Sequence, residues 1–138
     1  MAASPSILNK TLMPSGKPKI LIIEDESALI YALRAKFSAS GFEATIALNG
    51  ELALEFADKE KFDIILLDLL LPKLNGFEVL SRFKANPKTV STPVIIFSNL
   101  DSAEDKKRAL DLGASDYLMK AQTSLDEVIK IINKLIKK

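Results

Sequence analysis

The fold of this chain is decided by the stretch Phe62-Asp63-Ile64-Ile65-Leu66-Leu67-Asp68-Leu69-Leu70-Leu71-Pro72. It is a short apolar run with one carboxylate, Asp68, near its middle and a proline at its end. Such a run, bounded by turn residues, is typical of a strand buried on both faces of a parallel sheet. Because an unpaired carboxylate is costly to bury, we expect Asp68 at the carboxyl end of the strand, where open α/β sheets place their ligand crevices.

The size and composition of the chain are those of one globular domain. It has 138 residues, of which 48% are hydrophobic and 27% charged, enough for a single sizeable core. Its 19 basic and 18 acidic residues leave a net charge of +1, and the basic residues are scattered, so we expect no direct contact with nucleic acid. No apolar segment approaches the roughly 20 residues of a membrane span. The N-terminus lacks a secretion signal and the chain lacks cysteine, which favours a cytoplasmic location without membrane insertion.

Histidine is absent from the sequence. This excludes His-based acid–base catalysis, Ser-His-Asp triads and the commonest transition-metal ligand. A functional site must therefore use carboxylates, hydroxyls, lysines and backbone groups, a set that favours a hard cation such as Mg²⁺.

Strand-like and helix-like segments alternate from residue 19 onward, which predicts an α/β domain over residues 19–138. Residues 1–18 mix Ser, Pro, Gly and Lys with isolated apolar residues, and we interpret them as a flexible tail. Strict alternation predicts a parallel sheet with helices on both faces, and right-handed crossovers restrict it to a few doubly wound arrangements. The expected strands are Ile20–Glu24, Glu43–Ala47, Ile64–Asp68, Val94–Ser98 and Asp116–Lys120.

The helices between these strands have recognisable start and stop signals. The first is expected to stop at Gly41, and the third to end before Pro87. The expected starts are Asn49 for the second helix, Asn75 with Glu78 for the third, Asp101-Ser102 for the fourth, and the capping box of Ser124 with Glu127 for the fifth.

Polar side chains follow the ends of several expected strands. Since the carboxyl ends of parallel strands meet at one edge, these residues become neighbours there. Clustered carboxylates repel one another, and Mg²⁺, which takes oxygen ligands, would neutralise them. Taken singly, each has an ordinary explanation, such as a solvated loop, a helix cap or a strand-end hydrogen-bond acceptor. The residues are Glu24-Asp25-Glu26 after the first strand, Asp68 after the third, Ser98 after the fourth and Lys120 after the fifth.

As an ordered set, these motifs resemble the receiver domain of two-component response regulators, in particular single-domain, chemotaxis-regulator-like members. The resemblance spans residue 19 to about residue 136 and implies a flavodoxin-like sheet of five parallel strands in the order 2-1-3-4-5. The matching segments are Ile20-Leu21-Ile22-Ile23-Glu24-Asp25-Glu26, Leu66-Leu67-Asp68 with Leu71-Pro72 and Asn75-Gly76, Ile95-Ile96-Phe97-Ser98, and Gly113-Ala114-Ser115-Asp116-Tyr117-Leu118-Met119-Lys120.

The resemblance implies a phosphoacceptor switch. Asp68 would be the nucleophile that takes a phosphoryl group from a phosphohistidine of a histidine kinase or a His-containing phosphotransfer protein. Mg²⁺ would be held by Asp68, by Asp25, by Glu24 through water, and by the backbone carbonyl of Leu70. Together with Lys120 it would neutralise charge on the transferring group, where positioning and electrostatics do most of the catalytic work.

The resemblance also assigns the switch residues. The Ser98 hydroxyl would hydrogen-bond a phosphoryl oxygen, and Tyr117 would then move inward and remodel the surface of the fourth helix, fifth strand and fifth helix for a downstream protein target. Without the resemblance, Tyr117 is an ordinary half-buried aromatic residue. No enzymatic activity beyond phosphorylation and dephosphorylation of Asp68 is expected. Because the chain has no histidine, the phosphoryl donor must be another protein or a small molecule.

Three features near the site depart from the family pattern. Glu24 replaces the commoner first aspartate and keeps its charge. Ala121 follows Lys120 where the family usually has a cis proline, and a non-proline cis bond costs about 3–4 kcal/mol, so we expect a trans bond and a displaced loop there. Asn99 stands where a small residue is typical and would narrow access to Asp68.

Two apolar residues, Leu70 and Leu100, occupy positions that often govern water access to the acyl phosphate. Their side chains predict slow self-dephosphorylation. The sequence ends within its fifth expected helix without a visible output domain, which fits either a single-domain regulator or a piece of a longer one.

Three other functions fit these residues less well. A Mg²⁺-dependent phosphohydrolase of the haloacid-dehalogenase type would want an Asp-x-Asp pair, but position 70 is Leu70. A receiver-like binding scaffold without phosphorylation is supported only by Ala121 and Asn99. A flavin or nucleotide carrier is disfavoured because the acidic loop after the first strand would repel a phosphate.

Overall fold

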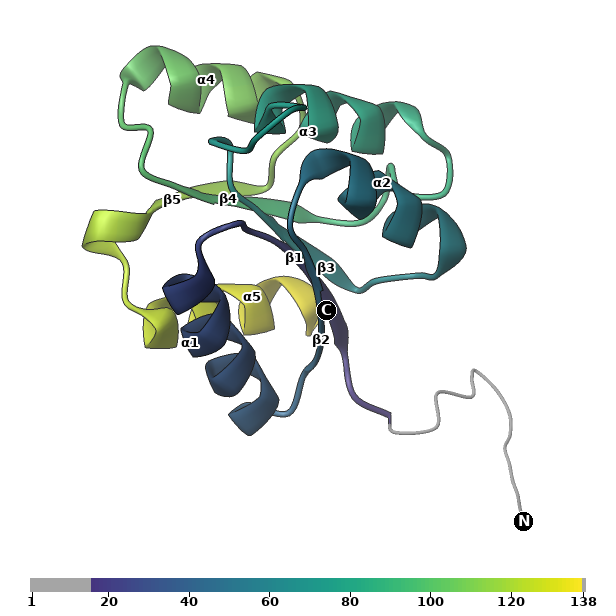
Figure 1. Ribbon diagram of the computed structural model, residues 1–138, viewed down its shortest axis with the longest axis vertical. Helices are drawn as coiled ribbons and strands as arrows, with labels where there is room; N and C mark the ends of the chain where they lie inside the picture. Colours follow the sequence, from purple (N-terminus) through teal and green to yellow (C-terminus); the bar gives the residue numbers. More distant parts are fainter. Residues whose placement is uncertain (1–15, 138) are drawn as a thin grey trace.

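A parallel sheet of five strands forms the centre of the computed structural model, which describes residues 16–137 (Figure 1). The strand order is β2-β1-β3-β4-β5, so the predicted doubly wound, flavodoxin-like topology is confirmed. Most of the predicted tail, residues 1–15, lies outside the described residues. The strands are β1 (Lys19–Ile23), β2 (Glu43–Ala47), β3 (Ile64–Leu67), β4 (Val94–Ser98) and β5 (Asp116–Met119).

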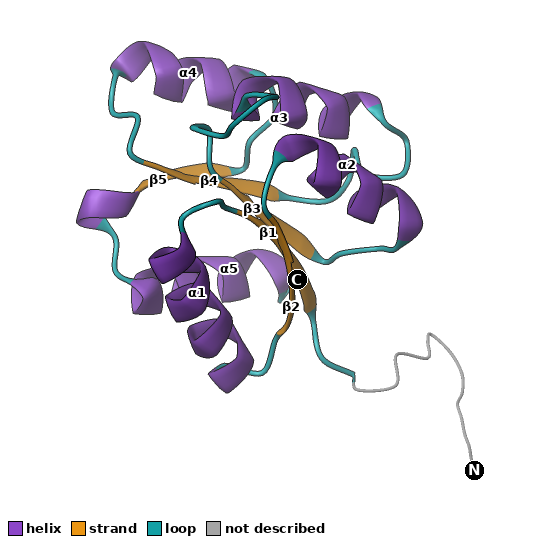
Figure 2. Cartoon of the chain, viewed as in Figure 1, coloured by secondary structure: helices purple, strands orange, loops and turns teal. Residues whose placement is uncertain are grey.

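Helices cover both faces of this sheet (Figures 1 and 2). One face carries α1 (Ser27–Ala39) and α5 (Leu125–Ile136), and the other carries α2 (Gly50–Lys59), α3 (Gly76–Ala85) and α4 (Ala103–Asp111). A short 3₁₀ helix, η2 (Lys120–Gln122), follows β5 and was not predicted. None of the described helices is long and apolar enough to cross a bilayer.

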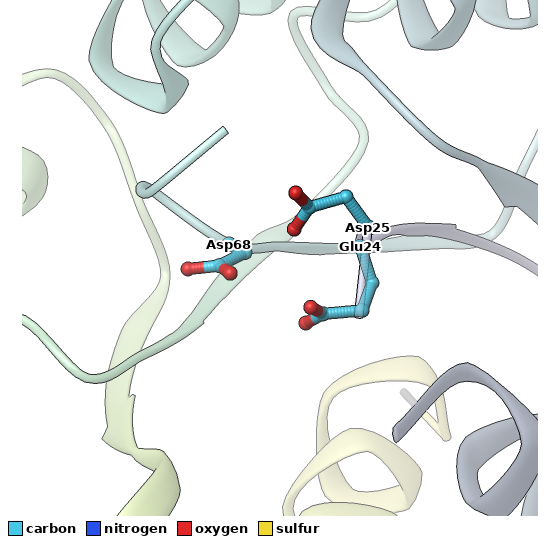
Figure 3. A group of neighbouring side chains, drawn as sticks. All are labelled: Glu24, Asp25 and Asp68. Carbon is cyan, nitrogen blue, oxygen red and sulfur yellow. The ribbon is translucent and has the colours of Figure 1, made fainter. Parts of the chain in front are cut away.

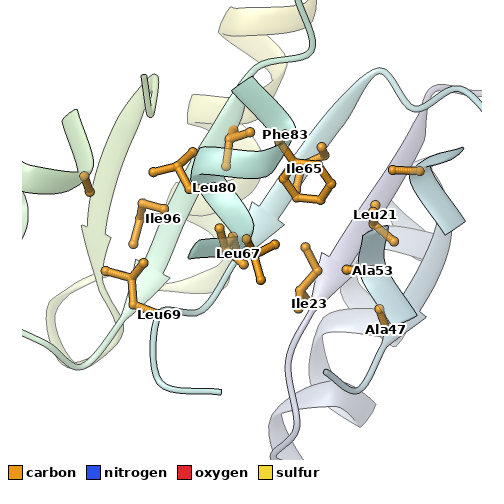
Figure 4. Close-up of a cluster of buried hydrophobic side chains, with 14 of the residues drawn as sticks. Leu21, Ile23, Ala47, Ala53, Ile65, Leu67, Leu69, Leu80, Phe83 and Ile96 are labelled. Carbon is orange, nitrogen blue, oxygen red and sulfur yellow. The ribbon is translucent and has the colours of Figure 1, made fainter. Parts of the chain in front are cut away.

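The central strands are buried on both faces, as the apolar run at 62–72 predicts. Every residue of β3 and of β4 is buried. Successive strand residues alternate between two core clusters, with Ile65 and Leu67 facing α2 and α3 (Figure 4) and Ile64 and Leu66 facing the opposite layer. Because both faces are covered, only the strand ends can present polar groups to solvent.

The predicted helix starts are confirmed by their capping hydrogen bonds. The Asn49 side chain accepts from Leu52 N (2.8 Å), and the Asn75 side chain accepts from Glu78 N (3.1 Å). Such caps satisfy backbone N–H groups that the first helical turn leaves free. Ser102 caps α4 in the same way, Ser124 and Glu127 form the predicted capping box of α5, and Gly41 follows α1 with a φ of 89°.

Three strands end one residue earlier than predicted, at Ile23, Leu67 and Met119. The residue after each of these is polar, and at that point the backbone leaves the strand conformation. Glu24 N and Asp68 N still donate to the neighbouring strands, to Ala47 O and Ile23 O (both 3.1 Å). The strands thus carry Glu24 and Asp68 to the edge of the sheet, beyond the fully apolar layer.

Candidate functional site

Three carboxylates meet at the carboxyl edge of the sheet. Glu24 and Asp25 follow β1, and Asp68 follows β3, the strand that pairs directly with β1. One oxygen from each side chain lies within 4.8 Å of the others, and the Glu24 and Asp25 side chains extend toward the side on which Asp68 lies (Figure 3). Glu24 and Asp68 are buried, whereas Asp25 is exposed. The predicted convergence of these residues is therefore confirmed.

Lys120 joins the two buried carboxylates. Its Nζ lies 2.9 Å from Glu24 Oε1 and 2.9 Å from Asp68 Oδ2. Burial acts to lower the pKa of Lys120, but the hydrogen bonds and negative charges of Glu24 and Asp68 outweigh it and raise the pKa. Lys120 is therefore a charged residue at neutral pH, and it partly neutralises the cluster.

Backbone amides hold the remaining oxygens of the buried carboxylates. Glu26 N donates to Glu24 Oε2, and Leu70 N donates to Asp68 Oδ1 (both 3.1 Å). Burial raises the pKa of Glu24, and the charge of Asp68 adds to the rise, while the hydrogen bond from Lys120 opposes it. Each buried carboxylate thus has one oxygen on the lysine and one on the backbone, which fixes its orientation.

Lys120 does not neutralise all the negative charge of the three carboxylates, so the site can bind a second cation. Three carboxylates against one ammonium group leave a surplus of negative charge, and the donor set consists of oxygens alone. Oxygen-only carboxylate sites suit Mg²⁺, which keeps several waters and needs few protein ligands. Asp25, exposed and without a hydrogen bond or ion pair among residues 16–137, is the carboxylate most accessible to such an ion.

Gly76 fixes the position of Asp68 from the other side. Gly76 N donates to Leu69 O (3.0 Å), which brings the start of α3 against the end of β3. A Cβ at position 76 would lie 2.5 Å from Leu69 Cα and 2.6 Å from Asp68 O. Only glycine permits this close backbone approach. The Asn75-Gly76 pair therefore both starts the helix and fixes the position of the Asp68 backbone.

Ser98 and Tyr117 lie on the adjacent strands β4 and β5. Ser98 is fully buried, and its Oγ accepts a weak hydrogen bond from Leu100 N (3.4 Å). Within residues 16–137 it makes no hydrogen bond to the carboxylates or to Lys120. Tyr117 is buried, and its hydroxyl donates to Leu100 O (2.7 Å). Both side chains are therefore connected to the loop at residue 100 rather than to the cluster itself.

The structure shows how the residues that depart from the family pattern are placed. The Lys120–Ala121 peptide bond is trans, as predicted. Lys120 lies in the site, because its long side chain reaches both carboxylates, and the expected displacement of the loop stays a prediction. Leu70 and Asn99 are exposed, whereas Leu100 is half-buried against the core.

Sequence reasoning missed three features of this site. It predicted that Lys120 would lie near the carboxylates, but not that Glu24 would pair with it. It did not predict the backbone donors Glu26 N and Leu70 N, because local turn geometry decides where those N–H groups point. The close packing at Gly76 had a signal in the Asn-Gly pair after Pro72, a pattern that is common in turns.

Sequences of known proteins match this chain over most of its length. Residues 20–133 match the family described as "Response regulator receiver domain". The chain is 38% identical over 102 residues to "Response regulator PleD" of Caulobacter vibrioides, which covers 74% of this chain and 22% of that protein. The chain spans less than half of the length of curated relatives of this kind.

Solved structures share the fold. The receiver domain of the Francisella response regulator 1452 is 36% identical, with a TM-score of 0.80 over 87% of this chain and 97% of that one. The receiver domain of the sensor histidine kinase PA1611 from Pseudomonas aeruginosa is 25% identical, with a TM-score of 0.81 over 89% of this chain and 100% of that one. That structure has a magnesium ion coordinated in its active-site cleft.

Proposed function

The chain belongs to the response regulator receiver domain family, and on that premise we propose that it is a phosphoacceptor switch that carries its phosphoryl group on Asp68. The observation that supports this most strongly is the ion pair between Asp68 and Lys120, in a cluster with Glu24 and Asp25 at the carboxyl edge of the sheet. We place the domain at residues 19–138 and its action in the cytoplasm, as the family implies.

The proposed step is a phosphoryl transfer between two side chains. A carboxylate oxygen of Asp68 attacks the phosphorus of a phosphohistidine on a partner, the P–N bond breaks, and a P–O bond forms. The histidine nitrogen leaves with the bonding electrons and is protonated from solvent. This chain contains no histidine, so the donor is a histidine kinase, a His-containing phosphotransfer protein or a small phosphodonor.

Lys120 and Ser98 stabilise the transferring group in this proposal. The Lys120 ammonium already contacts Asp68 Oδ2, so it is placed to neutralise negative charge that arrives on that oxygen. The Ser98 hydroxyl, at the end of β4, would turn from Leu100 N to a phosphoryl oxygen. Both groups lie at the same edge of the sheet as Asp68.

The residues present fit a bound Mg²⁺. Glu24, Asp25 and Asp68 provide the carboxylate oxygens, and the backbone carbonyl of Leu70 is a further ligand in this proposal. The magnesium in the PA1611 receiver domain supports this assignment by analogy. When bound, Mg²⁺ would supply positive charge against the phosphoryl oxygens.

The output of the switch would be a changed protein-binding surface. Ser98 and Tyr117 both bond to the backbone of Leu100, one to its N–H and one to its carbonyl. If Ser98 moves toward a phosphoryl group, the Leu100 backbone loses a partner and Tyr117 loses its fixed position. We propose that this alters the surface formed by α4, β5 and α5, which a downstream protein reads.

The test is phosphorylation by a small donor. Incubation with Mg²⁺ and acetyl phosphate should add the mass of one phosphoryl group to the intact protein, and removal of Mg²⁺ with EDTA should prevent it. Asp68→Asn should abolish the gain, whereas Asp58→Asn, a matched change at an exposed residue of α2, should leave it intact. An unmodified wild-type protein, or equal labelling of Asp68→Asn, would overturn the proposal.

A further inference from the structure

Glu24 and Asp68 share one ammonium group, and this sharing has a consequence for metal binding. Lys120 Nζ is 2.9 Å from an oxygen of each carboxylate, and the three side chains are 12% (Lys120), 3% (Glu24) and 5% (Asp68) exposed. The lysine therefore lies between two of the groups assigned to Mg²⁺. Without a metal, the Lys120 ammonium group is the cation that neutralises the two buried carboxylates.

No oxygen of the two buried carboxylates lacks a partner. Glu24 Oε1 accepts from Lys120 and Glu24 Oε2 from Glu26 N, while Asp68 Oδ2 accepts from Lys120 and Asp68 Oδ1 from Leu70 N. A cation that binds Glu24 would therefore share an oxygen that already accepts a hydrogen bond, and its positive charge would repel the Lys120 ammonium group beside it. Bonds between charged groups in a buried setting are the strong ones, so this competition has a measurable cost.

The length of the Glu24 side chain allows it to contact Lys120. Glu24 follows the last residue of β1, and Lys120 follows the last residue of β5, so β3 and β4 separate their strands in the sheet. An aspartate at position 24 would be one methylene shorter, and its carboxylate would stay closer to the β1 backbone. We expect it to lose the contact with Lys120, while Lys120 keeps its contact with Asp68.

We propose that Glu24 is a positioning residue that holds Lys120 as an internal counter-ion, and that this pair lowers the affinity of the site for Mg²⁺. The proposal rests on the function proposed above, and it concerns how readily that site is loaded. Glu24 thereby has two opposed effects, because it supplies a carboxylate to the metal and also a partner that competes with the metal.

A double-mutant cycle tests the proposal through Mg²⁺ affinity. Isothermal titration calorimetry with MgCl₂ would compare wild type, Glu24→Asp, Lys120→Met and the double variant. We expect Glu24→Asp to bind Mg²⁺ about tenfold more tightly than wild type, because the competing charge-assisted bond is absent. In the Lys120→Met background the same change should give no such gain. Glu51→Asp, on the exposed start of α2, is the matched control and should bind like wild type.

A spectroscopic readout gives an independent arm that does not depend on the folding of Lys120→Met. The ¹⁵N resonance of Lys120 Nζ should shift between Mg²⁺-free and Mg²⁺-saturated wild type, and should shift less in Glu24→Asp. Weaker Mg²⁺ binding by Glu24→Asp, an equal gain in both backgrounds, or an unchanged Nζ resonance in wild type would overturn the inference.

The two proposals can fail separately. Phosphorylation of Asp68 by acetyl phosphate, read by mass in wild type, tests the switch, and the order of Mg²⁺ affinities tests the role of Glu24. If wild type is phosphorylated and Glu24→Asp binds Mg²⁺ no more tightly, only the inference about Glu24 is wrong. If wild type takes up no phosphoryl group, the proposed function is wrong.

Discussion

Lys120 Nζ lies 2.9 Å from Asp68 Oδ2, although 52 positions separate the two residues in the chain. Asp68 follows β3 and Lys120 follows β5, and β4 runs between those strands in the sheet. The ion pair therefore spans the end of β4 and closes one side of the site. Both side chains are largely buried, so solvent screens their attraction little.

Removing Lys120 should destabilise the protein. Lys120→Met leaves Glu24 and Asp68 as buried carboxylates without a cationic partner, and such a loss costs about 3–5 kcal/mol of unfolding free energy. Urea unfolding followed by circular dichroism at neutral pH would measure it. The matched control is Lys88→Met, because Lys88 pairs with Asp58 at the surface and exposed pairs contribute about 0–1 kcal/mol. Equal losses in the two variants would contradict the prediction.

A double-mutant cycle that combines Lys120→Met with Asp68→Asn, read by the same urea unfolding, should show that the cost comes from the buried carboxylates. In the Asp68→Asn background one of the two buried charges is already gone, so Lys120→Met should cost clearly less than it does in wild type. An equal cost in both backgrounds would mean that Lys120 stabilises the protein through packing of its methylene stem instead.

The fold could be predicted from the sequence because its signals are local. The apolar run at 62–72 is long enough for a doubly buried strand, and Asn49, Asn75 and Ser124 each start a helix with a side-chain cap. The predicted ends of β1 and β3 are one residue too late, because the backbone N–H groups of Glu24 and Asp68 still donate to neighbouring strands after the strand conformation has stopped. The segment Lys120–Gln122 carries no strong helix or turn signal, and its 3₁₀ turn was missed.

The sequence predicts which residues of the site lie close together, but not which of them form hydrogen bonds or ion pairs. Parallel topology brings Glu24, Asp68 and Lys120 to one edge whatever their rotamers, and the structure confirms that. Which carboxylate the lysine contacts depends on side-chain length and on distances across the sheet of a few ångströms. Likewise, the hydrogen bonds of Ser98 and Tyr117 to Leu100 depend on a loop conformation that strand periodicity does not specify.

Leu70 should slow the loss of the phosphoryl group from Asp68. Leu70 is 53% exposed and follows Asp68 by two positions, where we expect an apolar side chain to keep water from the acyl phosphate. Leu70→Asn should speed dephosphorylation of the purified protein by about tenfold, equivalent to about 1.4 kcal/mol in the barrier. The decay would be followed by intact mass after removal of acetyl phosphate. Leu110→Asn, at an exposed leucine of α4, is the control, and fast decay in wild type that Leu70→Asn leaves unchanged would contradict the prediction.

Gly76→Ala should lower the unfolding free energy by about 2–3 kcal/mol, because its methyl group would overlap Leu69 Cα and Asp68 O in a region that cannot relax by rotating a side chain. It should also reduce phosphorylation of Asp68 by acetyl phosphate, since the backbone that carries the carboxylate must shift. Gly41→Ala separates the two effects. It introduces backbone strain at a φ of 89° but meets no atom within 4 Å, so it should cost about 1–2 kcal/mol without affecting phosphorylation. Full phosphorylation of Gly76→Ala would show that contacts other than those of Gly76 fix the position of Asp68.

Tyr117 should ionise at higher pH in the folded protein than in the unfolded chain. Burial raises its pKa, and the negative charges of Asp105, Asp101 and Asp68 add to the rise. The contribution of Tyr117 to stability, which includes its hydrogen bond to Leu100 O, is therefore fully present below the unfolded pKa near 10 and is lost as pH rises through the folded value.

This ionisation can be measured on a single tyrosine. The chain has two tyrosines, and Tyr31→Phe removes the exposed one, so absorbance at 295 nm then reports Tyr117 alone. We expect a midpoint above 10 in buffer, with circular dichroism confirming that the protein stays folded, and a lower midpoint in concentrated urea. Asp105→Asn should move the folded midpoint down, because it removes the second-largest cause of the rise. Identical midpoints in buffer and in urea would mean that the phenol is not held in the buried, negatively charged setting next to Leu100.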